Sequence, residues 1–193
     1  MSGLQQQDEI CLDKEFVGIP PPHNAHCPTI NELLDLCVNE HPRKGIASPS
    51  ESPVFWVKYG QAVYWNEVVA QDMAYHELRR LGSPVRAPAV FYAFQYDYRV
   101  FIVMKYIHGN TVSKRLEESQ NHAEKEDIID QVVLSLTELH RIPIPSGSRP
   151  AAVDGGYIRH ALFDEQEAPR HYENVEQLEL HLNEVGPYFE LLC

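Results

Sequence analysis

One short apolar segment limits what this chain can fold into more than any other feature. Residues 54–59 have the sequence VFWVKY, and Gly60 ends the run. Aromatic and β-branched residues in such a run predict a buried β-strand. Lys58 is the exception, because an unpaired buried ammonium costs several kcal/mol. The fold must therefore give Lys58 a carboxylate partner or bring its ammonium to the solvent at the end of the strand.

The segments around this strand predict a mixed α+β order. The sequence from Thr29 to Glu32 has the form of a capping box and predicts a helix that ends by His41-Pro42. Residues 42–53 and 143–172 are rich in proline and glycine and predict loops. The remaining periodic segments predict helices over 66–81, 111–116, 124–141 and 174–185, and an antiparallel hairpin from strands over 89–95 and 100–107.

Composition excludes several classes of function. The chain has 193 residues, with 16 Lys and Arg against 28 Asp and Glu and a net charge of -12. Such a charge repels phosphate backbones and anionic lipid headgroups, so we expect no nucleic-acid partner and no membrane partner. The amino terminus lacks the basic and apolar stretches of a secretory signal, and the four cysteines form no close pair. We therefore expect a cytoplasmic protein with free thiols.

A family resemblance follows from the order and spacing of several short segments. They are the strand 57–60, the helix start 67–71, the link 86–90, the run 101–111, and the stretches 139–143, 154–160 and 176–185. Together they resemble the small lobe of the protein-kinase-like fold, in the form of the aminoglycoside phosphotransferase and choline-kinase-like enzymes and above all their fungal branch. The likeness covers roughly residues 53–185.

The resemblance implies an α+β fold. An antiparallel sheet plus a helix would form the kinase-like small lobe, and the first helices of the large lobe would follow it. The division that we predict is a loose N-terminal lead-in over 1–28, the small lobe and hinge over 29–107, and an incomplete helical large lobe over 108–193.

The resemblance also implies a nucleotide-binding role for Lys58 and Glu67. In this fold the strand lysine holds the α- and β-phosphates of ATP, and a glutamate on the next helix holds the lysine. Glu77 is a competing partner, although Glu67 is preferred. The alternative interpretation is that Lys58 only emerges at a strand end with its ammonium in water.

Met104, Lys105, Tyr106 and Ile107 correspond to the hinge between the lobes. There the extended backbone pairs with the adenine edge, and Met104 would back the adenine. Lys105 stands where a glutamate is usual in the family, which leaves a backbone contact possible but removes an acidic side chain. The alternative is an apolar edge strand in which Met104 is a core residue.

The catalytic motifs of the family are missing from these residues. Neither an H-G-D-x-x-x-x-N loop nor a later D-x-D or D-W-E motif occurs, so we expect a chain truncated before the catalytic loop. The sequence His140-Arg141-Ile142 carries isoleucine in place of the acid, and Asp154 beside two glycines predicts a turn. Gly45 is the only glycine in the segment that would close over the phosphates.

The functional hypothesis is an ATP-dependent small-molecule phosphotransferase-like protein with little turnover by itself. ATP and Mg²⁺ are the cofactors, and a small-molecule hydroxyl the acceptor, that the resemblance implies. The alternative is a non-catalytic pseudokinase or interaction module. We assign no catalytic residue and no metal ligand, and the sequence indicates neither the acceptor nor the oligomeric state. A continuation beyond residue 193 would show itself as exposed apolar surface on the helix 124–141.

Overall fold

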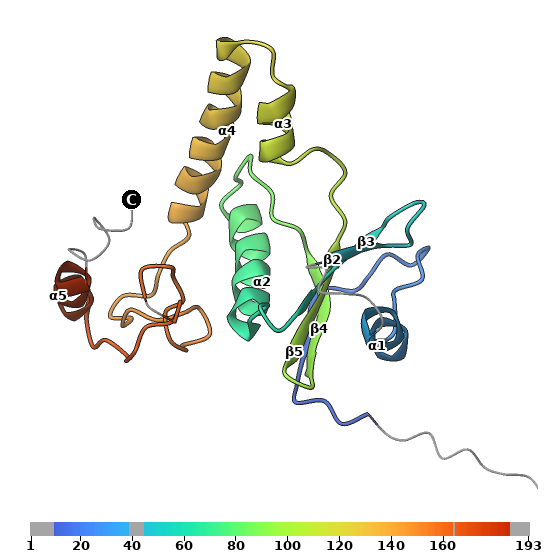
Figure 1. Cartoon of the computed structure of the whole chain (residues 1–193), viewed down its shortest axis with the longest axis horizontal. Coiled ribbons are helices and arrows are strands. Elements are labelled where there is room, and N and C mark those ends of the chain that lie inside the picture. The colour runs from blue at the N-terminus through green and yellow to red at the C-terminus, as the bar shows by residue number, and fades with distance from the viewer. Residues whose placement is uncertain (1–9, 39–44, 164, 186–193) are drawn as a thin grey trace, which may run out of the picture.

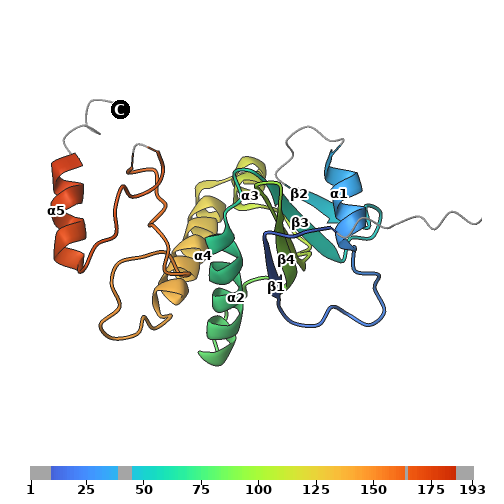
Figure 2. The ribbon, with the colours of Figure 1, turned by 90° about the horizontal axis from the view of Figure 1, so that it is seen from below.

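The computed structural model describes residues 10–38, 45–163 and 165–185. These residues form one five-stranded sheet and five helices, arranged as Figures 1 and 2 show. In chain order the elements are β1 (Lys14–Val17), α1 (Ile30–Val38), β2 (Gly45–Ser48), β3 (Phe55–Gly60), α2 (Trp65–Arg80), β4 (Val90–Tyr96), β5 (Arg99–Lys105), α3 (Val112–Glu118), α4 (His122–His140) and α5 (Val175–Val185). The mixed α+β class predicted from the sequence is confirmed.

The sheet is antiparallel and is built outward from one hairpin. Its strand order is β1-β4-β5-β3-β2. The predicted hairpin joins β4 to β5, with Phe94 opposite Phe101. The chain reverses at Asp97 and Tyr98, whose φ angles are 49° and 58°. On the far side of β5, Lys58 of β3 lies opposite Ile102.

The two faces of the sheet are covered by different helices. Side chains alternate between the faces along a strand. Phe55, Val57 and Tyr59 of β3 join a core cluster with Leu33 of α1. On the other face Ile102 and Met104 of β5 pack in a second cluster with Val68 of α2. The sheet therefore lies between α1 and α2, as both views show (Figures 1 and 2).

Stacked aromatic rings fill the α1 side of the sheet. The rings of Phe94 and Phe101 are parallel within 4°, with centroids 4.5 Å apart. Tyr59 stacks on the other side of Phe101 at 5.9 Å. The side chain of Phe101 is 1% exposed, so its ring is enclosed between neighbours on adjacent strands.

Two strands lie where the sequence predicted irregular segments. The lead-in predicted for 1–28 contains β1, which pairs along β4, and the connection predicted for 42–53 contains β2, which pairs along β3. Each has four residues at an edge of the sheet and is held largely by backbone hydrogen bonds, so neither needs a strong apolar alternation. The predicted end of the first helix at His41-Pro42 falls outside the described residues.

The predicted capping box at the start of α1 is confirmed. The backbone amide of Thr29 donates to Glu32 Oε2 at 2.7 Å, and the amide of Glu32 donates to Thr29 Oγ1 at 3.3 Å. His26 Nε2 lies 2.9 Å from Glu32 Oε1. The amide of Thr29, followed by the His26 ring, lowers the pKa of Glu32 from 4.5 to about 2.

This cap predicts a specific pH dependence of stability. Because the pKa of Glu32 is depressed in the folded chain, its stabilising contribution is complete above about pH 4.5 and is lost as the pH falls toward about 2. We expect Glu32→Gln to lower the urea midpoint at pH 7, and the difference from wild type to shrink between pH 4.5 and 2. Urea titrations of both proteins across this pH range measure the difference between their midpoints. A difference that stays constant with pH would contradict the assignment.

α4 carries an exposed apolar stripe. Ile129 is 52% exposed, Val133 54%, Leu136 53% and Leu139 40%. The opposite side of α4 meets α3 and α2, where Ile128 and Glu138 are buried. The exposed apolar surface that the sequence analysis anticipated on the helix 124–141 is therefore present. No helix among the described residues is long and apolar enough to cross a membrane.

The segment between α4 and α5 has a small core of its own. Phe163, Ala168 and Tyr172 are buried together, and Leu178 and Leu182 of α5 pack against them. The Tyr172 hydroxyl lies 2.6 Å from His181 Nδ1 and ties the loop to the helix. Asp154 forms the predicted turn, in which its carboxylate accepts from the amide of Gly156 at 3.0 Å.

Candidate functional site

Lys58 and Glu67 meet on the α2 face of the sheet. Phe55, Val57 and Tyr59 of β3 face α1, and because side chains alternate along a strand, Lys58 points to the opposite face. Glu67 lies in the first turn of α2, which covers that face. Lys58 Nζ donates to Glu67 Oε2, and the two side chains are 35% and 33% exposed. The contact predicted from the sequence is confirmed. An ion pair this open to solvent contributes about 1 kcal/mol or less to stability.

The competing partner Glu77 is engaged elsewhere. Its carboxylate accepts from Arg80 Nη2 at 2.6 Å, one helical turn away. The Arg80 guanidinium lowers the pKa of Glu77. Glu77 thus belongs to an ion pair on the surface of α2, and Glu67 is the partner of Lys58.

Glu67 is held at both carboxylate oxygens. While Oε2 accepts from Lys58, Oε1 accepts from the backbone amide of Tyr64 at 3.1 Å. The amide of Glu67 in turn donates to the carbonyl of Tyr64 at 3.0 Å. The carboxylate therefore caps the helix and orients the lysine, which ties the position of the ammonium to the start of α2.

Trp56 lies beside Lys58 and was not among the residues predicted for the candidate site. It lies two residues before Lys58 on the same face of β3 and opposite Met104 of β5, and 36% of it is exposed. Its ring centroid is 6.3 Å from that of Tyr106. A side chain at Gly45 would approach the indole to 2.4 Å, so the glycine makes room for the ring. The two-residue repeat of strands could have placed this indole beside Lys58.

The predicted hinge residues 104–107 lie across the end of β5, whose last residue is Lys105. Met104 is 8% exposed and Ile107 56%. The amide of Lys105 donates to the carbonyl of Ala89, and that of Tyr106 to Val54, both at 2.9 Å. Ile107 lies two residues beyond the end of β5, and its amide makes none of the turn and loop backbone hydrogen bonds between described residues.

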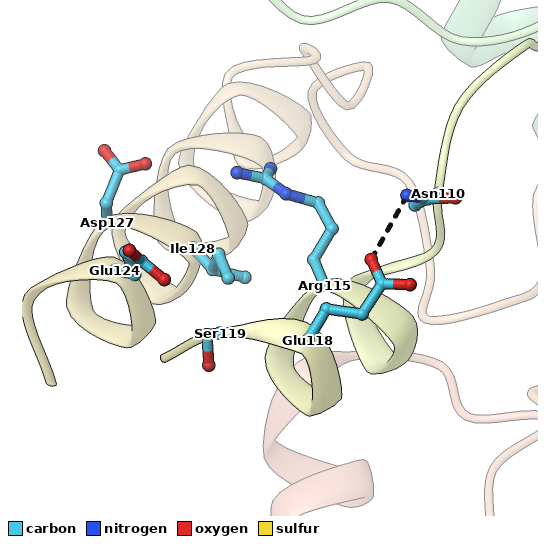
Figure 3. Close-up of a pocket in the computed structure, with 7 residues that line it drawn as sticks. All are labelled: Asn110, Arg115, Glu118, Ser119, Glu124, Asp127 and Ile128. Atoms are coloured by element: carbon cyan, nitrogen blue, oxygen red, sulfur yellow. Dashed lines mark hydrogen bonds between the residues drawn. The ribbon is translucent and has the colours of Figure 1, made fainter. Parts of the chain in front are cut away.

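A separate pocket lies between α3 and α4. The residues that line it are Asn110, Arg115, Glu118, Ser119, Glu124, Asp127 and Ile128 (Figure 3). Arg115 donates to Gln131 at 2.8 Å, and Asn121 caps α4 by accepting from the amide of Glu124 at 2.9 Å. None of the predicted site residues lines this pocket. In the part of the chain that the structure describes, no three His, Cys, Asp or Glu side chains are grouped to hold a metal ion.

The fold and this geometry define a class. An antiparallel sheet whose strand lysine pairs with the next helix's first-turn glutamate, followed by a hinge strand and helices, is the small lobe and the start of the large lobe of a kinase-like protein. The sequence model of the phosphotransferase enzyme family, APH, matches residues 63–186, which is more than half of the chain. The chain belongs to that family.

The matched span is informative about the site. It includes Glu67 and the predicted hinge residues 104–107 and begins after Lys58. Lys58 is joined to the matched span by its contact with Glu67. No curated protein and no solved structure matches the chain.

Proposed function

We propose that this chain binds the triphosphate of ATP through Lys58, with Glu67 as the residue that orients the ammonium. The contact between these two side chains carries the proposal. A lysine at this point in a phosphotransferase fold places a positive charge beside the α- and β-phosphates. One-third exposure of both side chains leaves the ammonium accessible to a ligand.

The adenine would lie along the hinge. The carbonyl of Lys105 accepts from the exocyclic amine, and the amide of Ile107 donates to a ring nitrogen. Met104 backs the base, and the half-exposed indole of Trp56 offers a flat surface on which it stacks. The exposed lysine at 105 does not disturb these contacts because they use the backbone.

Mg²⁺ would enter this site on the nucleotide. The described residues offer no cluster of metal ligands, and the Glu67 carboxylate already has two donors. Mg²⁺ commonly keeps most of its waters and binds substrate phosphates. The phosphates are thus the ligands that the ion finds here, and the protein supplies the cation beside them.

Catalysis is a separate matter from binding. Members of the family transfer phosphate to small-molecule hydroxyls, and we propose that an acceptor of this kind belongs to the whole reaction. The H-G-D and D-x-D motifs do not occur in the 193 residues. Because positioning and electrostatic terms supply most of phosphoryl-transfer catalysis, we propose that this chain by itself has negligible turnover.

Fluorescence of Trp56 tests the binding proposal. The chain has two tryptophans, so Trp65→Phe leaves Trp56 as the only indole. We expect Mg-ATP to quench its emission because the adenine stacks on the ring, and Mg-tripolyphosphate, which lacks a base, to leave it nearly unchanged. A parallel thermal-shift titration reports occupancy without the indole.

A lack of response would favour the second candidate. If millimolar Mg-ATP changes neither the fluorescence nor the melting temperature, the chain is a non-catalytic pseudokinase or interaction module. Lys105, exposed at the hinge where the family usually has a glutamate, is the observation that favours this candidate.

A further inference from the structure

We propose that Arg159 is a positioning residue that fixes the start of α2, and with it the Lys58–Glu67 pair, from the loop that follows α4. The nucleotide part of this inference rests on the proposed function. The positional part concerns the free protein and can be tested without nucleotide.

Arg159 contacts the residue that precedes α2. Its guanidinium carbon lies 3.7 Å from the centroid of the Tyr64 ring. A guanidinium over an aromatic face is attracted by the ring electrons and packs flat against it. Tyr64 is the residue immediately before α2. Figure 1 shows the loop on the side of α2 that faces away from the sheet.

Arg159 is itself held in place within the loop. Its guanidinium pairs with Glu167, and the two side chains are each 32% exposed. The same residues are joined by an antiparallel backbone bridge, beside which the amide of Ala168 donates to the carbonyl of Ile158 at 2.8 Å. Ala168 belongs to the buried core of the loop. The backbone at Arg159 is therefore fixed to the buried core of the loop.

Tyr64 is connected to Lys58 through the Glu67 carboxylate. The amide of Tyr64 is one of the two donors to the Glu67 carboxylate, and Lys58 is the other. A shift of Tyr64 removes the first donor and frees the carboxylate to turn away from Lys58. Holding the Tyr64 ring thus limits where the ammonium can lie.

Helix electrostatics alone would not place Arg159 here. A helix N-terminus carries partial positive charge and disfavours a nearby cation. The Glu167 carboxylate offsets this repulsion by neutralising the guanidinium. The contact with the Tyr64 ring is therefore what attracts Arg159 to the start of α2. A test of the positioning role has to remove this contact.

The experiment measures amide hydrogen exchange in the free protein. Arg159→Met keeps the length of the side chain and removes its charge and planarity. We expect exchange of the amides 64–69 to rise about threefold to tenfold, and Arg159→Lys to fall in between because it keeps a cation over the ring. The matched control is Arg170→Met, since Arg170 contacts Tyr172 within its own loop. We expect this control to exchange like wild type over 64–69.

A second variant distinguishes the loss of this contact from a general loss of stability. Tyr64→Leu removes the ring and leaves the loop sequence intact, so it should raise exchange over 64–69 as Arg159→Met does. Unchanged exchange over 64–69 in both variants overturns the inference. A rise that is equal over the whole sheet also overturns it, because it would show only a lower global stability.

The nucleotide readout separates this inference from the proposed function. In the Trp65→Phe background, Arg159→Met should weaken the apparent affinity for Mg-ATP about threefold to tenfold. An affinity equal to that of Arg170→Met would overturn the positioning role even if wild type binds. If wild type shows no response to Mg-ATP, the proposed function fails and the exchange measurements still decide the role of Arg159.

Discussion

Lys58→Met is expected to abolish most of the thermal stabilisation that, under the proposed function, Mg-ATP gives to this chain. A charge-assisted hydrogen bond contributes about 1.5–3 kcal/mol, which corresponds to roughly a 10- to 100-fold loss of affinity. The Glu67 carboxylate would also lose its partner and repel the triphosphate. The free protein should change little, because the ion pair is one-third exposed and contributes about 1 kcal/mol or less. Thermal-shift titration with Mg-ATP measures both quantities.

The control for this variant is another lysine changed in the same way. Lys114 lies on α3, with 57% of its side chain exposed, in an ion pair with Glu118. Lys114→Met removes the same charge from the chain, so it should keep the full response to Mg-ATP. If Lys58→Met binds Mg-ATP within about twofold of wild type, Lys58 is not a phosphate-binding residue.

That Lys58 needs a partner could be predicted from the sequence, because the lysine interrupts an apolar strand. The choice of Glu67 as that partner depended on the family resemblance, in which a glutamate on the next helix holds the strand lysine. The capping box of Thr29 and Glu32 was predictable because its residues are close in sequence and form a recognisable pattern.

Features that depend on tertiary neighbours were not predictable in this way. β1 and β2 are short edge strands whose existence depends on the backbone of β4 and β3. The role proposed for Trp56 depends on Met104 lying opposite it and on the space left by Gly45. The contact between Arg159 and Tyr64 joins segments far apart in the chain, and no local sequence pattern around either residue indicates that they meet.

The apolar side of a helix is buried only where the rest of the fold covers it. On α1 the apolar side carries Leu33, which is buried in the core beside the sheet. On α4 the same kind of pattern produced a stripe that remains about half exposed. Periodicity indicates that a helix has an apolar side, but the rest of the fold determines whether that side is covered.

Phe101→Ala is expected to have the largest effect on stability. The ring is 1% exposed and stacks between Phe94 and Tyr59, so its loss removes contacts on both adjacent strands. Truncation of a buried phenylalanine costs about 3–5 kcal/mol, a large part of the 5–15 kcal/mol typical of a domain. Urea unfolding measures this loss in the free energy of unfolding. The control is Tyr98→Ala, because Tyr98 lies at the hairpin tip and is 83% exposed, and its free energy of unfolding should stay within about 0.5 kcal/mol of wild type. A loss below about 1 kcal/mol would mean that the stack does not hold β3 and β4 to β5, and that the position of Lys58 depends on α2 instead.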